Sequence, residues 1–342
     1  MHRLNLILLG VACCFLIAMV KRIGWAEPAL YIRQVGFYAP LVLVPYGIST
    51  LFSSLAWKVL LIGNGTHPTL GRLFLLRLGG ESLNQLTPTA SLGGEPFKAF
   101  LLHAAGTPWT EAVASLVIQK GLLVLSLVLY ILVSIALVPF VLSGGHLSVV
   151  GLLTGACVLG GLGMAFVVVQ ISKPWNLLAR ILKRFGFNPA LIKGREAEFD
   201  NLDSLLADFY HAHPKRILAA FILFFLGWVT LSSEVFLIFI LMGHPLGWGT
   251  SLCLDGLAML FTSMGFMIPV SLGVQDGGNV FLSLGFNLGA TLGAAFSIIR
   301  RLREAFWLAV GLVVVAWERW RGNDRIRTQQ NDPIVPDRTL PS

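Results

Sequence analysis

Residues 79–96 of the chain read GGESLNQLTPTASLGGEP. This stretch contains two carboxylates, an amide pair, four hydroxyls, four glycines and two prolines, and apolar residues flank it. Pro88 and Pro96 each remove a backbone donor and disrupt helix. At membrane depth, irregular backbone survives only where it is buried in protein or lines an aqueous cavity. The meaning of this stretch therefore depends on whether the rest of the chain spans a membrane.

The composition is that of a membrane protein. Of 342 residues, 56% are hydrophobic and 12% are charged, and the mean hydropathy is +0.78. Soluble domains are about 45–50% apolar and about 25% charged. These values exclude a soluble enzyme, a disordered chain and a disulfide-stapled secreted domain. The net charge of +8 comes from basic residues between apolar runs, as in cytoplasmic loops, which makes nucleic-acid binding a poor explanation.

We predict an all-α polytopic membrane protein. A helix needs about 20 residues to cross about 30 Å of hydrocarbon. Two further apolar stretches, about 70–105 and 250–298, are interrupted by Gly, Pro and polar residues. The basic segment 173–215 and the basic C-terminal tail predict that both termini are cytoplasmic. Six runs qualify as full spans: about 4–20, 36–61, 113–142, 148–171, 216–243 and 303–318.

The second half of the sequence repeats features of the first at a constant offset of 180 residues. The run SLG at 91–93 recurs at 271–273, and Lys120 falls opposite Arg300 at the same offset. If each interrupted stretch is a re-entrant hairpin, each half crosses three times, and the halves form an inverted repeat as in many transporters. The fold is then six full spans plus two Gly/Pro-broken hairpins, although eight or ten full spans remain open.

The repeat also predicts the domain organisation. The predicted domains are a first membrane repeat, 1–142, a second membrane repeat, 143–322, with the cytoplasmic loop 173–215, and a disordered cytoplasmic tail, 323–342.

The second interrupted stretch contains IPVSLGVQDGGN at 268–279, which repeats the polar pattern of 79–96. Broken segments in corresponding places of two halves point to a central substrate site. The alternative is that both stretches are loops outside the membrane. No metal-ligand spacing or nucleotide motif is present, so we predict no cofactor and no metal. The predicted substrate-binding residues are Glu81, Asn84, Pro88, Ser91, Gly93, Gly94, Glu95, Lys120, Pro269, Ser271, Gly273, Gln275, Asp276, Arg300 and Arg301.

Charges inside apolar runs need partners. A charge at a helix centre costs about 2.5–3.5 kcal/mol on insertion scales. Lys120 is expected either to pair with Glu95 or Glu81 or to extend toward the interface. Arg300 shares a helix face with Glu304 and could hold an anionic head group or act as an interfacial anchor.

Two acidic residues also lie within apolar runs. Glu234 and Asp255 are candidates for proton sites or for satisfied structural residues.

These residues resemble a known family. Gly80, Glu81, Asn84, Pro88 and the run GGE at 93–95, followed by a span with a basic residue, resemble the lysylphosphatidylglycerol synthase transmembrane-region family, also called flippase-like. Pro269, Gly273, Asp276 and Arg300 resemble its second motif region, although Asp276 stands where glutamate is more usual. The similarity covers about 30–318. The family includes hopanoid-biosynthesis-associated members.

The resemblance implies a multi-pass protein of the bacterial inner membrane. It implies a translocase that moves a lipid or lipid-linked head group between leaflets, without an attached aminoacyl-transferase domain. Its partners would be membrane lipids, with anionic or lipid-linked head groups. Two alternatives are a non-catalytic membrane partner of lipid- or glycan-synthesis enzymes, in which the polar residues join helices, and a lipid head-group transferase.

Overall fold

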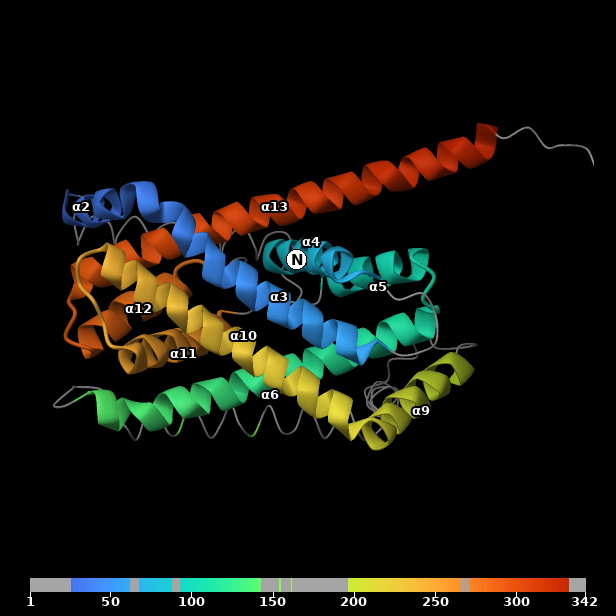
Figure 1. The fold of residues 1–342 in the computed structure, drawn as a ribbon, viewed down its shortest axis with the longest axis horizontal. Coiled ribbons are helices and arrows are strands. Elements are labelled where there is room, and N and C mark those ends of the chain that lie inside the picture. The colour runs from blue at the N-terminus through green and yellow to red at the C-terminus, as the bar shows by residue number, and fades with distance from the viewer. Residues whose placement is uncertain are drawn as a thin grey trace, which may run out of the picture.

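The computed structural model describes residues 26–61, 68–87, 93–142, 154, 161, 196–265, 268 and 271–331. In these residues every regular element is a helix (Figure 1), which confirms the all-α prediction. The elements are α2 (Ala26–Val35), the 3-10 helix η1 (Gly36–Val42), α3 (Leu43–Leu60), α4 (Leu70–Leu86), α5 (Glu95–Ala104), α6 (Trp109–Val141), α9 (Glu196–Ala212), α10 (Pro214–Leu241), α11 (Trp248–Met264), α12 (Val274–Gly285) and α13 (Ala290–Asn331).

Three helical stretches in the described residues are long and apolar enough to cross a membrane. They are Ala29–Leu60, Trp109–Val141 and Pro214–Leu241, and they coincide with three predicted spans. Large apolar side chains are exposed on the outside, including Phe37 at 93% and Phe140 at 84%, as a lipid-facing surface requires. The predicted spans 4–20 and 148–171 lie outside the described residues.

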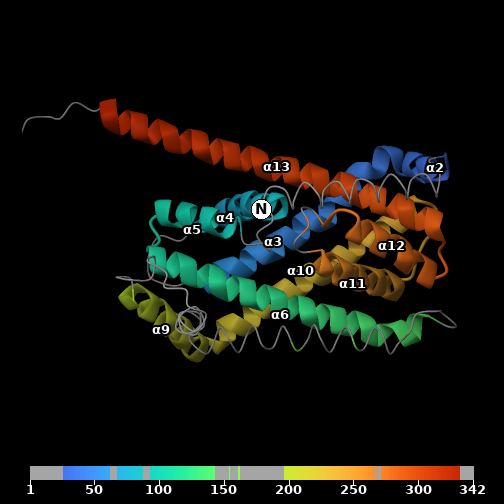
Figure 2. The same ribbon diagram turned by 180° about the vertical axis from the view of Figure 1, so that it is seen from behind.

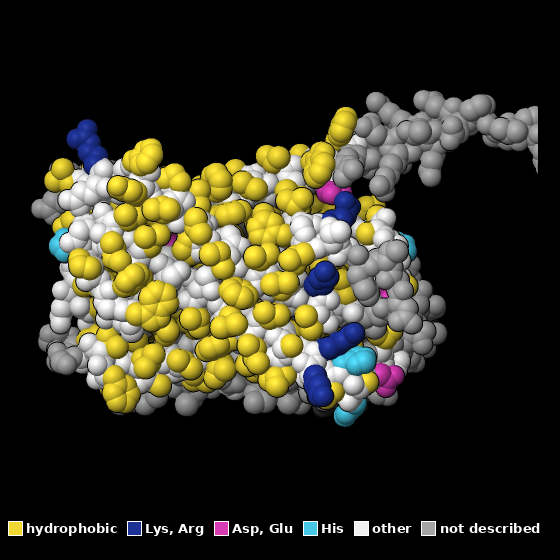
Figure 3. Space-filling view, in the orientation of Figure 1, with side chains coloured by type: hydrophobic (Ala, Val, Ile, Leu, Met, Phe, Trp, Pro, Cys, Tyr) yellow, Lys and Arg dark blue, Asp and Glu magenta, His cyan; other side chains and the backbone are white. Residues whose placement is uncertain are grey.

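Figure 3 shows hydrophobic side chains spread over one face, while most Lys and Arg side chains visible there lie toward the end that holds α9. Helix α9 occupies part of the predicted loop 173–215. Its Leu206 and Phe209 pack with Ala220 and Phe224 of α10. Burial raises the pKa of Tyr210 to about 12. The part of the connector that forms α9 therefore packs against the helix bundle.

Helix α13 differs from the predicted span 303–318. Glu304 and Glu318 bound the apolar stretch between them, and α13 is absent from the candidate spans found in the described residues. The exposed Val313, at 68%, still requires apolar surroundings. The helix continues to Asn331, and the disordered tail 323–342 stays a prediction.

Helices α3 and α10 cross at the centre of the molecule, as Figures 1 and 2 both show. Gly227 of α10 lies against Ser49 and Ser53 of α3, and a Cβ at 227 would lie 3.4 Å from the backbone carbonyl oxygen of Ser49, at van der Waals contact. Gly227 is one of the positions at which the two halves match, since the repeat aligns it with Gly47.

Each interrupted stretch forms two helices with a break between them. Helices α4 and α5 lie toward one end of the molecule, and α11 and α12 lie toward the other (Figure 1). The element boundaries follow the predicted offset: adding 180 to Glu95–Ala104 gives 275–284, and α12 spans Val274–Gly285. The same shift carries α3, α4 and α6 onto α10, α11 and α13.

The lengths of the short helices bear on the span count. Helix α5 has 10 residues and α12 has 12, which at 1.5 Å per residue gives about 15 and about 18 Å. A crossing of the hydrocarbon needs about 30 Å, so these lengths favour re-entrant hairpins over ten full spans. The number of spans and the inverted orientation of the halves across a bilayer stay predictions.

Candidate functional site

The first broken segment gathers a set of polar side chains that we call the first cluster. Asn84 connects them: its Oδ1 accepts a hydrogen bond from the Gly94 N–H at 2.7 Å, and its Nδ2 donates to Glu81 at 2.8 Å and to Glu95 at 3.3 Å. One amide thus joins α4 to the start of α5 and closes the hairpin. The first cluster consists of Arg77, Glu81, Asn84, Glu95, Lys98 and Lys120.

Glu95 is the shared acceptor of the first cluster. Lys98 Nζ lies 2.8 Å and Lys120 Nζ lies 3.7 Å from Glu95 Oε1. Pairing with Glu95 is one of the alternatives expected for Lys120, beside pairing with Glu81 and extension toward the interface. The carboxylate also begins α5, where the positive end of the helix dipole favours an anion. Glu95 therefore stabilises the hairpin and neutralises two lysines that lie in apolar surroundings.

Glycines allow the two arms of this hairpin to meet. A Cβ at Gly94 would overlap the carbonyl oxygen of Gly80, and a Cβ at Gly80 would overlap the side chain of Lys98. Backbone therefore lies against backbone at this point, and the lysine stem covers the contact. Two glycines of the family-like motif, 80 and 94, thus have a packing role in addition to any role in binding.

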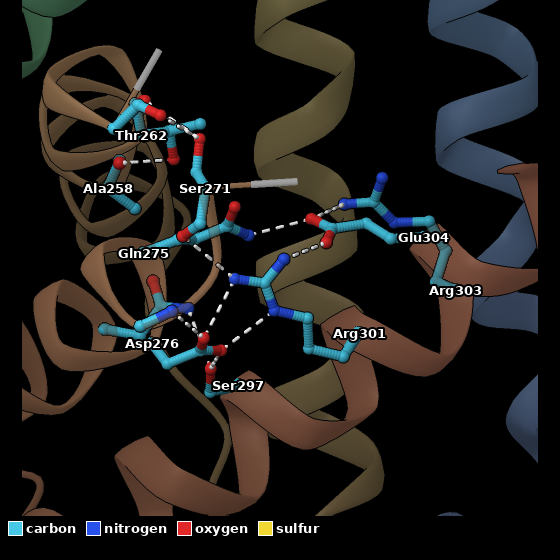
Figure 4. Close-up of polar contacts among 12 residues, drawn as sticks. Ala258, Thr262, Ser271, Gln275, Asp276, Ser297, Arg301, Arg303 and Glu304 are labelled. Atoms are coloured by element: carbon cyan, nitrogen blue, oxygen red, sulfur yellow. Dashed lines mark hydrogen bonds and ion pairs between the residues drawn. The ribbon is translucent and has the colours of Figure 1, made fainter. Parts of the chain in front are cut away.

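The second broken segment forms another polar network, shown in Figure 4. Asp276 accepts a hydrogen bond from the Gly273 N–H at 3.0 Å and from Ser297 Oγ at 2.6 Å. Arg301 Nε and Nη2 each donate to Asp276 at 2.9 Å, a bidentate arrangement that is strong and orientation-specific. Gly273 has φ +81, a conformation that favours glycine. Asp276 thus fixes the start of α12 to α13.

The network around Asp276 continues along α13. Arg301 Nη1 donates to Glu304 at 2.8 Å, and Gln275 Nε2 donates to the other oxygen of Glu304 at 2.8 Å. Arg303 lies 3.8 Å from Glu304 and donates to Glu234 of α10 at 3.1 Å. This network therefore ties α10, α12 and α13 together.

Arg300 is paired differently from the expectation. It donates to Asp255 at 2.6 Å, and the side chains of the pair are only 2% and 0% exposed. Tyr130 also donates to Asp255, at 2.9 Å. Arg301, not Arg300, pairs with Glu304. Together these residues form what we call the second cluster: Glu234, Asp255, Gln275, Asp276, Ser297, Arg300, Arg301, Arg303 and Glu304.

A cavity of about 100 Å³ lies between α3, α4, α6 and α10. Arg303 of the second cluster lies over the ring of Tyr46, 4.8 Å from its centroid, and Tyr46 lines the cavity. The first cluster therefore lines this space directly through Arg77 and Glu81, and the second cluster reaches it only through the contact of Arg303 with Tyr46. Its polar lining residues include Tyr46, Ser49, Thr50, Ser53, Arg77 and Glu81.

Three charged or aromatic residues of this site were not predicted. Arg77 and Lys98 lie within the first broken segment and are 6% and 2% exposed, and Tyr46 lies in α3. The signal for the two cations was available, because ionisable residues in apolar segments mark functional sites by default. Tyr46 has no such signal, since its position depends on how α3 meets α13.

The predicted site residues fall into three groups. The first cluster unites Glu81, Asn84, Glu95 and Lys120, with Gly94, and Gly93 lies in the turn before α5. The second unites Gln275, Asp276, Arg300 and Arg301, with Gly273, and the carbonyl of Ser271 accepts from Arg301 at 3.3 Å. Pro88, Ser91 and Pro269 lie outside the described residues.

The two clusters hold their charges by pairing carboxylates with Lys and Arg. In the residues that the structure describes, no group of three or more His, Cys, Asp or Glu is placed to hold a metal ion.

A family described as Lysylphosphatidylglycerol synthase TM region has a sequence model that matches residues 5–314. No curated protein matches the chain. No solved structure matches it either.

Proposed function

The chain belongs to the lysylphosphatidylglycerol synthase TM region family, and from this we propose that it moves a lipid or lipid-linked head group between the leaflets of a membrane. The membership itself supports a membrane location and a role connected with membrane lipids. We further propose the bacterial inner membrane, cytoplasmic termini and a relation to the hopanoid-associated members.

One observation carries the proposal: a charged cluster built on a broken segment lines a cavity near the crossing of α3 and α10, and Arg303 of a second such cluster lies against Tyr46 in the wall of that cavity. Head groups are polar, and the hydrocarbon core is about 30 Å thick. A polar centre bounded by irregular segments offers a head group a path while its acyl chains stay in lipid. Glu95 and Asp276, one from each cluster, each join a break to a neighbouring long helix.

In this mechanism the two hairpins act as alternate gates. The first hairpin closes through the Asn84 bridge between Glu81 and Glu95, and the second closes through the bidentate pair of Asp276 and Arg301. Protonation of either carboxylate, or its exchange for a head-group anion, would loosen one hairpin at a time. Opening from opposite ends would give alternating access.

The test is lipid movement in proteoliposomes. Fluorescent lipids with several head groups are incorporated, and the outer-leaflet signal is quenched over time. The Glu95→Gln, Asp276→Asn double variant should abolish movement, because both gates lose a carboxylate. The matched control is Glu111→Gln, Asp208→Asn, which makes the same chemical changes outside both clusters. It should move lipid at the wild-type rate.

Unchanged movement in the folded double variant would contradict the proposal. No movement of any lipid by folded wild-type protein would favour the membrane-partner function, and the next measurement would be co-purification of lipid- or glycan-synthesis enzymes. A lipid of altered mass after expression would favour a transferase.

A further inference from the structure

Glu234 of α10 is a buried carboxylate with one oxygen that has a partner and one that has none. Its side chain is 1% exposed, and its Oε1 accepts from Arg303 Nε at 3.1 Å. Its Oε2 is buried without a hydrogen-bond partner among the described residues, and it is the only carboxylate oxygen of those residues in this position. A buried acceptor without a donor is costly, and more so when it is charged. A proton on Oε2 would remove that charge.

The other carboxylates of the second cluster have donors on both oxygens. This holds for Asp255, for Asp276 and for Glu304. Hydrogen bonds to the ionised form favour that form over the protonated one. Within the second cluster, Glu234 is therefore the carboxylate best suited to take up a proton.

The side chains around Glu234 offer no other proton acceptor. Those that act on it directly or through one neighbour come from α3, α6, α11 and α13. They are Tyr46, Tyr130, Asp255, Arg300, Arg303 and Glu304. The arginines among them stay charged and the phenols already hold their protons. Proton uptake in this region therefore belongs to a carboxylate.

The charges of the second cluster do not balance. It contains four carboxylates and three guanidiniums, a formal excess of one negative charge, whereas the first cluster contains three basic and two acidic side chains. One proton on Glu234 would neutralise the second cluster and leave the two clusters together with one net positive charge. That charge attracts an anion, so proton uptake and the binding of an anion would favour each other.

Arg303 connects Glu234 to the second hairpin. Its Nη2 lies 3.8 Å from Glu304 Oε1, so a neutral Glu234 would shift the attraction of this guanidinium toward Glu304. Glu304 accepts from Arg301 at 2.8 Å, and Arg301 holds Asp276 at the start of α12. A change of charge at Glu234 therefore reaches the second hairpin through two arginines of α13.

The cavity offers solvent protons a route to Glu234. Leu231 lines the cavity and lies one helical turn before Glu234, so the two side chains share a face of α10. The cavity volume is about 100 Å³, enough for several water molecules, each of which occupies about 30 Å³ in the liquid. Water in this space would carry protons to within one helical turn of the carboxylate.

We propose that Glu234 is a proton-binding site coupled to the second hairpin. A proton from water in the cavity bonds to Oε2, the carboxylate becomes a neutral carboxyl, and Arg303 moves from Glu234 toward Glu304. The same oxygen releases the proton when the protein returns to its first state. That this proton drives lipid movement rests on the proposed function, whereas the binding of the proton does not.

Proton binding is measured from infrared difference spectra of the full chain in neutral detergent, because a protonated carboxyl has a C=O stretching band that a carboxylate lacks. On acidification the wild-type protein should gain a band that is missing in Glu234→Gln. Glu111→Gln is the matched control, since it makes the same change in α6 outside both clusters, and it should keep the band. A band of full intensity in folded Glu234→Gln, or its absence from the wild-type protein, would overturn the proposal.

A second substitution keeps the test valid if the amide disturbs folding. Glu234→Asp retains the carboxyl on a shorter side chain, so its band should persist at a shifted frequency. A band at the wild-type frequency in Glu234→Asp would assign the proton to another residue and overturn the proposal. Both variants are expected to fold, because each keeps an oxygen acceptor at this position and Arg303 also lies over the ring of Tyr46.

Coupling is measured in the proteoliposome assay, with the same fluorescent lipids and a pH difference across the membrane. If one proton accompanies each lipid, the lipid should accumulate in one leaflet up to about tenfold per pH unit, since one unit is about 1.4 kcal/mol. Glu234→Gln should lose this accumulation and Glu111→Gln should keep it. Accumulation that persists in Glu234→Gln would overturn the coupling.

The two measurements separate this inference from the proposed function. Protonation of Glu234 without any lipid movement would sustain the proton site and contradict the proposed function. Lipid movement that ignores the pH difference, in a protein whose Glu234 takes up no proton, would overturn this inference and leave the proposed function in place.

Discussion

The two clusters share a backbone plan and differ in how they use their charges. In the second, Arg300, Arg301 and Arg303 each pair closely with a carboxylate, and Asp276 accepts from a backbone N–H, a hydroxyl and a guanidinium. In the first, Arg77 and Glu81 line the cavity. The comparison indicates that the second cluster chiefly stabilises the fold, whereas the first presents charged groups to the cavity. Substitutions in the second cluster should therefore chiefly lower stability, and substitutions in the first cluster should chiefly impair function.

The largest effect on stability is expected in the second cluster. Asp255→Asn leaves Arg300 buried without its carboxylate, and breaking a buried pair costs about 3–5 kcal/mol. The double variant Asp255→Leu, Arg300→Met should regain most of this free energy, because it also removes the buried charge. Equilibrium unfolding in mixed micelles measures both. A loss of unfolding free energy below about 1 kcal/mol, the value for exposed pairs, would contradict a stabilising role for the second cluster.

The next effect tests the close approach within the first hairpin. Gly94→Ala adds a Cβ that overlaps the Gly80 carbonyl, and overpacking costs about 1–3 kcal/mol. Gly71→Ala is the control, because nothing lies within 4 Å of a Cβ there and alanine favours helix by about 1 kcal/mol. The unfolding free energy should fall in the first variant and hold or rise in the second. Equal stabilities would mean that the two arms can separate freely.

A smaller stability effect with a large functional effect is expected at Lys120. Its side chain is 20% exposed and lies 3.7 Å from Glu95, so Lys120→Gln should lower the unfolding free energy by about 1 kcal/mol or less. Lipid movement should fall about tenfold, the equivalent of about 1.4 kcal/mol in the transport barrier. Arg301→Gln should instead lower stability and movement together. If Lys120→Gln lowers the unfolding free energy as much as Arg301→Gln does, the two clusters do not differ in their contribution to stability.

The smallest effect is expected outside both clusters. Arg72 pairs with Glu318, and its side chain is 32% exposed, so Arg72→Gln should change the unfolding free energy by about 0–1 kcal/mol. Lipid movement should match that of wild type. A strong transport defect in this variant would show that loss of positive charge on α4 impairs movement even outside the two clusters.

Much of the helix plan was predictable from local pattern. The offset between the two halves matched the helix boundaries, because each half carries a stretch with several Gly and Pro residues at the corresponding place, and both residue types destabilise helix. For Lys120 the sequence left open pairing with Glu95, pairing with Glu81 and extension toward the interface, and the structure has the pairing with Glu95. A lysine within an apolar span needs a carboxylate, and the first broken segment offered only Glu81 and Glu95.

The pairing of the arginines on α13 was harder to predict. Helical spacing alone joins Arg300 to Glu304. Successive residues on a helix point about 100° apart, so Arg300 and Arg301 face different neighbours. Asp255 of α11 lies on the Arg300 side, and Asp276 of α12 lies on the Arg301 side. The neighbours that compete for each guanidinium come from other helices, which spacing along one helix does not reveal.

The sequence by itself determined that this protein is a helical membrane protein of a recognisable family, and where its two segments break. Hydropathy, glycine and proline act through the local backbone and its solvent, so they can be read along the chain. Only the tertiary structure decided which charges are satisfied and which face the cavity. That outcome depends on the crossing of α3 and α10 and on the rotation of each helix about its axis, which bring together residues far apart in the chain.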